Sequence, residues 1–165
     1  SIKREPIDPA AEDLAPYTFL YLSGLDDFAF EPAAATRLRD FLHNSGTLVI
    51  NNGLGLQRFD QAVRRELKAL LPAAELKPIP PEHPLYSTMF PVNRAQYTPA
   101  VRSEYPELAA PYLEGIHLNG ELRVIYSPID LAAGWQGADY PAAKAYQAST
   151  AIPLGMNIIF YAATH

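Results

Sequence analysis

Cysteine is absent from the 165-residue sequence. This absence excludes disulfide bonds, a cysteine nucleophile, iron–sulfur clusters and zinc sites with cysteine ligands. It does not indicate a compartment, because a chain without cysteine tolerates oxidising and reducing surroundings equally well.

Long apolar runs and an excess of positive charge are also lacking. No apolar stretch approaches the roughly 20 residues that a membrane-spanning helix needs, so we expect no direct membrane insertion of this chain. Lysine and arginine number 13 against 18 aspartate and glutamate residues, which gives a formal net charge of -5. This acidic balance does not favour nucleic acid or an anionic lipid surface as a partner.

The remaining composition is that of a folded globular protein. Hydrophobic residues make up 48% and charged residues 19% of the chain, which argues against disorder. The length suits one domain. We therefore predict a single α/β domain over residues 1–165 with a polar N-terminal arm at 1–15. Because the chain begins at Ser1 rather than methionine, we expect it to be a piece of a longer product.

The first half of the chain predicts two strand–helix units. Thr18–Ser23 and Thr47–Asn51 are short apolar runs typical of buried strands. Pro32 can open the first helix and Gly46 is expected to cap its end, while the second helix covers about 58–71. The buried face of the first helix is expected to comprise Ala34, Leu38, Phe41 and Leu42. This alternation indicates βαβ units and a mostly parallel sheet.

The second half of the chain predicts an irregular segment, a hairpin and a helix. Residues 77–111 are rich in proline and aromatic side chains, so we expect a long excursion that forms an ordered cover rather than a flexible linker. Asn119-Gly120 lies between two alternating segments and predicts a tight hairpin turn. Residues 150–164 are apolar nearly all round, which predicts a well-buried helix, although residues 157–162 alone also fit a strand.

Polar side chains follow three of the predicted strands, where open α/β sheets bind their ligands. These residues either cap helices and close turns, or they converge on one polar site. In the second case Asp26 and Asp130 form a carboxylate pair for acid–base chemistry or for Mg²⁺ or Ca²⁺. The candidate ligand-binding residues are Asp26, Asp27, Asn51, Asn52, Gly53, Ser127 and Asp130, with Trp135 as a cover.

Residues 51–58 resemble a glycine-rich phosphate turn between a strand and a helix. Arg58 occupies the position of the third glycine, which normally permits close helix–strand packing. Two interpretations remain: a phosphate bound at the helix N-terminus, or a tight turn without a ligand.

Familiar hydrolase and metal signatures are missing. The sequence contains neither G-x-S-x-G nor H-E-x-x-H, and none of its four histidines lies within four residues of another. His117 is expected on the exposed face of the hairpin, whereas His83 and His165 need the fold to bring them to a site. The sequence therefore assigns no catalytic residue, no metal site and no cofactor.

Two further features can each be interpreted as structural or as functional. Arg64-Arg65-Glu66 forms either a solvated helix face with local ion pairs or an arginine turned inward over a loop carboxylate. Trp135, the single tryptophan, is either a lid over a small polar ligand or a plug for the edge of the sheet, and we favour the plug.

Several sequence blocks follow one another in a recognisable order. They are Tyr17–Gly24, Phe59-Asp60 with Arg64–Glu66, Pro81–Leu85, Tyr126–Leu131 with Gly134-Trp135, and Gly155–Ile158 through Tyr161. In this order they resemble bacterial domain-of-unknown-function family 4159, from about Pro16 to His165. The Tyr-Ser-Pro-x-Asp-Leu block with Gly-Trp is the most specific part.

The resemblance implies a flavodoxin-like, three-layer α/β/α sandwich of the class I glutamine amidotransferase-like superfamily. Amidotransferases of that superfamily use a Cys–His–Glu triad, so the absence of cysteine excludes their activity here. Family members usually carry another strand and helix upstream, which we expect this chain to lack. Their attachment to exported or membrane-linked proteins implies a periplasmic or cell-envelope location.

These observations favour a non-catalytic domain that binds a small polar ligand or a protein partner. One alternative is a hydrolase that uses Asp26 or Asp130 as a general base, with a divalent cation. Another is a structural module of a larger membrane-linked protein, which predicts an exposed apolar patch where the upstream elements would dock.

Overall fold

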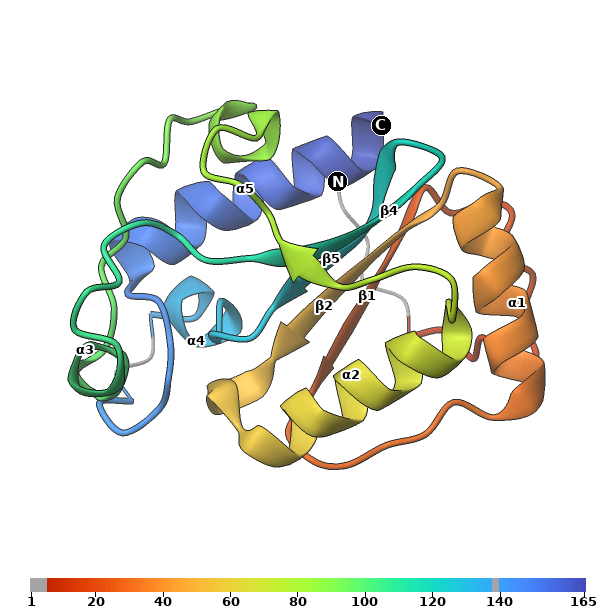
Figure 1. The fold of residues 1–165 in the computed structure, drawn as a ribbon, viewed down its shortest axis with the longest axis horizontal. Helices are drawn as coiled ribbons and strands as arrows, with labels where there is room; N and C mark the ends of the chain where they lie inside the picture. Colours follow the sequence, from red (N-terminus) through yellow and green to blue (C-terminus); the bar gives the residue numbers. More distant parts are fainter. Residues whose placement is uncertain (1–5, 138–139) are drawn as a thin grey trace.

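A five-stranded mixed sheet forms the centre of this α/β protein (Figure 1). The computed structural model describes residues 6–137 and 140–165. The sheet has the order β1-β2-β5-β4-β3, and its strands are β1 Phe19–Gly24, β2 Thr47–Asn52, β3 Lys77–Pro78, β4 Glu114–Leu118 and β5 Glu121–Ser127.

The sheet is mixed, so the expectation of a mostly parallel sheet with one hairpin is met only in part. The pairs β1–β2 and β2–β5 are parallel, as predicted for βαβ units. The pairs β5–β4 and β4–β3 are antiparallel. The hairpin places β4 beside β5 in the opposite direction, and the short β3 then adds to the edge that β4 exposes.

Helices α1 (Pro32–His43) and α2 (Gln57–Leu70) pack together against one face of the sheet (Figure 1). The residues expected on the inner face of α1 are all buried. Strand β2 alternates between the two faces of the sheet, because Leu48 and Ile50 contact the α1–α2 side while Val49 contacts the opposite side.

Helix α5 (Ala148–Thr164) covers the opposite face of the sheet. The sequence predicted a well-buried helix, but one face of α5 is exposed. On this face Ile152, Met156 and Phe160 are 48%, 42% and 44% exposed. No described segment covers that face. Within the described ranges, no helix has the length and apolar character needed to cross a membrane.

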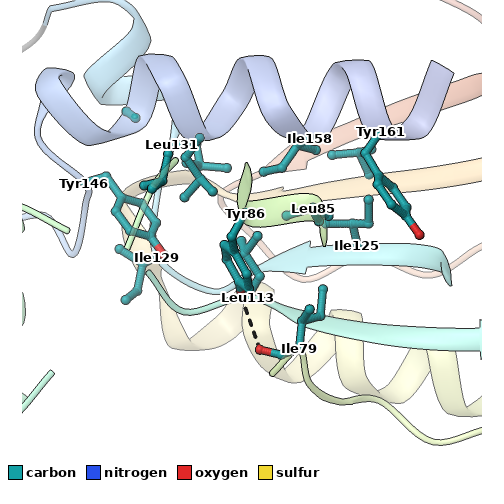
Figure 2. Close-up of a cluster of buried hydrophobic side chains, with 14 of the residues drawn as sticks. Ile79, Leu85, Tyr86, Leu113, Ile125, Ile129, Leu131, Tyr146, Ile158 and Tyr161 are labelled. Atoms are coloured by element: carbon teal, nitrogen blue, oxygen red, sulfur yellow. Dashed lines mark hydrogen bonds between the residues drawn. The ribbon is translucent and has the colours of Figure 1, made fainter. Parts of the chain in front are cut away.

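The proline-rich excursion fills the space beside α5. It contains β3, the 3₁₀ helix η2 (Pro84–Ser87) and helix α3 (Pro99–Glu104). Figure 2 shows Tyr86 in the cluster of apolar side chains below α5, and its hydroxyl donates a hydrogen bond to the Ile79 carbonyl at 3.3 Å. Tyr86 and Tyr97 are each only 2% exposed, so this segment supplies part of the core.

Two turns show how the local backbone follows the residue types. In the β4–β5 hairpin, Asn119 and Gly120 both have positive φ, at 52° and 84°, as the Asn-Gly signal predicts. At the end of α1 the left-handed residue is Ser45, with φ 73°, and not Gly46 as expected. A side chain at Gly46 would meet the Phe41 ring at 2.4 Å, so this glycine is needed for space.

Candidate functional site

The fold brings together some of the polar residues predicted at the strand ends. Asn51 pairs in register with Ser23 on one side and with Ser127 on the other. Its amide nitrogen donates to Ser23 Oγ at 3.2 Å and to Asp130 Oδ1 at 2.9 Å, and its oxygen accepts from the Leu131 N–H at 2.8 Å. Asn51 is fully buried, and its polar atoms all have partners inside the protein.

The Asp130 carboxylate is likewise engaged by internal donors. Besides Asn51, the backbone N–H groups of Leu54 and Ala132 donate to it at 2.9 and 2.8 Å. Asp130 is 3% exposed. Its carboxylate joins the loop after β2 to the short helix α4 (Ala132–Trp135), and its bond to Ala132 closes a turn, as in the interpretation that these residues close turns.

The polar groups of the glycine-rich turn after β2 also bond to one another. The Asn52 side chain donates to the Leu56 carbonyl at 3.0 Å and accepts from the Leu56 N–H at 2.9 Å. A side chain at Gly53 would meet Leu25 at 2.6 Å, and one at Gly55 would meet Lys144 at 2.5 Å. Because Leu54 and Leu56 already use their N–H groups, the geometry favours the tight turn over a phosphate site.

Asp26 and Asp27 lie on the surface, apart from the buried cluster. Asp26 forms an ion pair with Arg58 at 2.9 Å, and Asp27 forms one with Arg65 at 3.0 Å. Their side chains are 70% and 68% exposed. Asp26 therefore does not form the suggested carboxylate pair with the buried Asp130.

Trp135 and Ser127 have structural contacts. The Trp135 indole donates to the Ala151 carbonyl at 2.6 Å and lies so close to Gly155 that a Cβ there would be 2.4 Å from Nε1. Ser127 Oγ donates to the Ile129 carbonyl at 2.5 Å. The indole at the end of α4 thus packs against α5.

A cavity of about 900 Å³ opens beside the carboxyl ends of β2 and β5. One wall comes from α2 and the start of β4, and the other from the segment that follows α3. The residues that line it are Asn52, Gly55, Gln57, Asp60, Arg64, Glu104, Tyr105, Pro106, Glu107, Leu108, Tyr112, Glu114, Pro128, Ile129 and Lys144. Of the residues predicted as ligand-binding, only Asn52 belongs to this cavity.

Arg64 lies at the centre of the charged wall. Its guanidinium contacts both oxygens of Asp60, at 2.9 and 3.1 Å, and both oxygens of Glu114, at 3.1 and 2.9 Å. The hydroxyl of Tyr126 donates to Asp60 at 2.8 Å, and that of Tyr112 donates to Glu114 at 2.9 Å. The Arg64 guanidinium therefore pairs with two carboxylates, and each carboxylate also accepts a hydrogen bond from a tyrosine hydroxyl.

The protonation states of this network follow from its contacts. Burial alone lowers the pKa of Arg64, but the hydrogen bonds and charges of Asp60 and Glu114 outweigh this effect and raise it. Burial and the neighbouring Glu114 raise the pKa of Tyr112 to about 12. Burial and the Asp60 carboxylate also raise the pKa of Tyr126. Near neutral pH the guanidinium stays charged and both phenols stay protonated donors.

One carboxylate oxygen of the network has an unused acceptor capacity. Glu114 is 7% exposed at its side chain. Its Oε2 lies 2.9 Å from Arg64 Nη1 as an ion pair, yet it accepts no well-aligned hydrogen bond from any described residue. A buried acceptor without a hydrogen bond is uncommon in proteins, and here the positive charge of Arg64 is its partner.

The sequence contained a partial signal for this wall. One of the two interpretations of Arg64–Glu66 was an arginine turned inward over a loop carboxylate. Arg64 reaches Glu114, which is the first residue of β4 and not a loop residue, and it also forms the local ion pair with Asp60 that the other interpretation predicts. Arg65 follows the other interpretation, because it pairs with Glu66 and Asp27 on the surface. Glu114 and Tyr112 were not predicted, since a lone acid and a lone tyrosine carry no pattern before the fold places them.

Three of the four histidines, His83, His117 and His165, also come together. The rings of His83 and His117 have centroids 6.1 Å apart, and Tyr161 stacks on His165 at 4.1 Å and faces His83 at 5.4 Å. The Leu85 N–H donates to His83 Nδ1 at 3.2 Å, which caps η2. In the part of the chain that the structure describes, no group of three or more acidic, histidine or cysteine residues is arranged to hold a metal.

Comparisons with known proteins complete the description. No curated protein matches the sequence. A family model matches residues 1–163, which is nearly the whole chain. The match agrees with the resemblance of the ordered sequence blocks, and the chain therefore belongs to the family described as "Domain of unknown function (DUF4159)".

Proposed function

We propose that this domain binds a small polar molecule in the cavity between α2 and the segment that follows α3. The observation that carries the proposal is the cavity itself, with Arg64 held between Asp60 and Glu114 on its wall. Its volume of about 900 Å³ lies within the range of about 300–1,000 Å³ that is typical of small-molecule sites.

The position and lining of the cavity support this proposal. It lies beside the carboxyl ends of parallel strands, where α/β sheets commonly bind ligands. Its lining combines apolar side chains, such as Leu108 and Ile129, with a few fixed polar groups on the opposite wall. This combination buries the body of a ligand and orients its polar atoms.

Binding without turnover is the form of the proposal that the side chains support. Asp60 and Glu114 are both paired with Arg64, and the Tyr112 phenol, with its pKa of about 12, is a poor base near neutral pH. The hydrolase alternative has less support, because Asp130 is enclosed by three donors and Asp26 is exposed and paired.

A thermal-shift screen with one blocking variant tests the proposal. The panel contains amines, sugars, amino acids, nucleotides, carboxylates and divalent cations. A ligand at about 100 times its Kd stabilises the fold by about 2.7 kcal/mol, which raises Tm by roughly 5 °C or more at this chain length. Gln57→Trp, which fills the cavity wall, should abolish the shift.

Gln61→Trp is the matched control, because Gln61 is exposed on the same helix but does not line the cavity. It should keep the shift. A shift that survives Gln57→Trp, or a panel without any shift, contradicts the proposal.

The finer features implied by the family resemblance are part of the same proposal. Helices on both faces of the sheet support a flavodoxin-like, three-layer arrangement, which would relate the domain to the glutamine amidotransferase-like superfamily. A bacterial, cell-envelope location rests on the resemblance alone.

The alternative of a structural module retains one supporting observation. It predicted an exposed apolar patch, and the outer face of α5 exposes Ile152, Met156 and Phe160. Exposed apolar patches of this kind are found at protein interfaces. The identity of a partner is not indicated by any described contact, so this alternative remains a prediction.

A further inference from the structure

The cavity lining carries more negative than positive charge. Four carboxylates line it against two cationic groups, which leaves two negative charges in excess. The acids are Asp60, Glu104, Glu107 and Glu114, and the cations are Arg64 and Lys144. Since Lys144 pairs with Glu104 at 2.6 Å, the excess lies at Glu107 and in the network around Arg64.

The buried network supplies one of these charges. Asp60 and Glu114 share a single guanidinium, so one carboxylate charge is left without a counter-charge. A bound cation in the cavity would balance this charge, since the attraction between charges acts beyond direct contact.

The aromatic side chains of the lining favour the same sign of charge. Tyr105 and Tyr112 both line the cavity, and the Tyr105 ring is 47% exposed. Lys144 Nζ already lies 6.0 Å from the centroid of that ring. The faces of tyrosine rings attract cations, whereas a phosphate or carboxylate would face both the ring electrons and the excess acids.

On the basis of the proposed function, we infer that the ligand of this cavity carries a positively charged amine on a partly apolar body. Glu114 and Asp60 balance the ammonium charge on one wall, and Glu107 adds to the negative potential. The apolar body lies against Pro106, Leu108 and Ile129 on the other wall.

Three probes of one shape and different charge test this inference. Benzylamine is a cation, benzyl alcohol is neutral and benzoate is an anion near neutral pH. Their Kd values are measured with the full chain by chemical-shift titration at low ionic strength. We expect benzylamine to bind at least tenfold more tightly than benzyl alcohol, and benzoate to bind most weakly. Added salt should reduce the advantage of benzylamine, because it screens partly exposed charges.

Two variants assign the effect to named residues. Glu107→Gln and Glu114→Gln should each weaken benzylamine severalfold while they leave the Kd of benzyl alcohol within about twofold, since each removes one charge and little volume. Glu107 is exposed, so its variant reports on charge even if Glu114→Gln disturbs the fold. Glu82→Gln, at an exposed acid outside the cavity, is the control and should change neither Kd.

The outcomes separate this inference from the proposed function. Failure of all three probes to bind would overturn this inference, whereas the proposed function would still stand on any panel ligand that Gln57→Trp blocks. Binding of the probes that Gln57→Trp does not affect would overturn both. Binding of benzyl alcohol or benzoate as tightly as benzylamine would keep the cavity as a binding site and overturn the positive charge. A benzylamine preference that both glutamine variants retain would also overturn the inference.

Discussion

At the scale of single residues, Asp130 shows how a polar strand end becomes a structural element. Its carboxylate accepts three hydrogen bonds, from Asn51, Leu54 and Ala132. In Asp130→Asn an NH2 group replaces one carboxylate oxygen. This group is a donor, so it cannot accept the hydrogen bonds that the oxygen accepted. We expect the free energy of unfolding to fall by about 2–4 kcal/mol, as measured by urea denaturation.

The control for this prediction is Asp27→Asn. Asp27 is exposed and forms a surface ion pair with Arg65, so its variant should change stability by less than about 1 kcal/mol. Equal effects of the two substitutions would contradict the structural role of Asp130. If Asp130→Asn folds, its ligand response should match that of the wild type, because Asp130 does not line the cavity.

His83 gives the molecule a pH dependence that also belongs to this scale. Partial burial, followed by the charges of His117 and His165, lowers its pKa in the folded protein below the usual 6.5. The folded state thus binds fewer protons at His83 than the unfolded state does. The contribution of this pKa difference to the free energy of unfolding is present above about pH 6.5 and is lost as the pH falls toward the lowered pKa. Protonation of Nδ1 also removes the acceptor for the Leu85 N–H.

The substitution His83→Asn separates the effect of histidine titration on stability from the effect of the η2 cap. His83→Asn keeps a capping acceptor but cannot titrate, so its urea midpoint should fall less than that of the wild type between about pH 7 and pH 5. His43→Asn, at an exposed position at the end of α1, should leave the wild-type pH dependence in place. Parallel pH profiles of wild type and His83→Asn would contradict the prediction.

At the scale of secondary-structure elements, the end of α1 makes the clearest prediction. Ser45 adopts φ 73°, a conformation that costs a serine more than a glycine, so Ser45→Gly should stabilise by about 0.5–1 kcal/mol. Gly46→Ala should destabilise by about 1–3 kcal/mol, because its Cβ would overlap the Phe41 ring. Thermal unfolding of the two variants checks whether the changes have opposite signs.

The elements themselves were largely predictable, and the exceptions have local reasons. The two amphipathic helices carry repeating patterns and the hairpin turn carries the Asn-Gly signal. Helix α1 begins at Pro32 as predicted, and α2 covers Gln57–Leu70 where about 58–71 was predicted. The exchange of roles between Ser45 and Gly46 was not predictable. It depends on where the Phe41 ring packs, which is a tertiary contact and not a sequence pattern.

At the scale of the whole molecule, we predict that the chain unfolds in one cooperative transition, as a single domain would. Trp135 lies between α4 and α5 and its ring is 6.0 Å from that of Tyr21 in β1, so its fluorescence reports on both ends of the chain. Tryptophan fluorescence and far-ultraviolet circular dichroism should therefore give coincident denaturation curves. Separate transitions would show that the 77–111 segment or α5 unfolds independently.

The amino-acid sequence alone determined the α/β class, the first two strand–helix units, the hairpin and the exclusion of cysteine chemistry. These features depend on periodicity, turn residues and composition, which are local properties of the chain. It also indicated the edge of the sheet near which the cavity lies.

Only the tertiary structure decided which polar residues meet and which remain free. It enclosed Asn51 and Asp130 in their own hydrogen bonds, and it brought Arg64, Tyr112 and Glu114 together around a cavity. Arg64 and Glu114 are 50 positions apart. Such a pair has no short-range pattern, because the crossing of α2 over the start of β4 creates it.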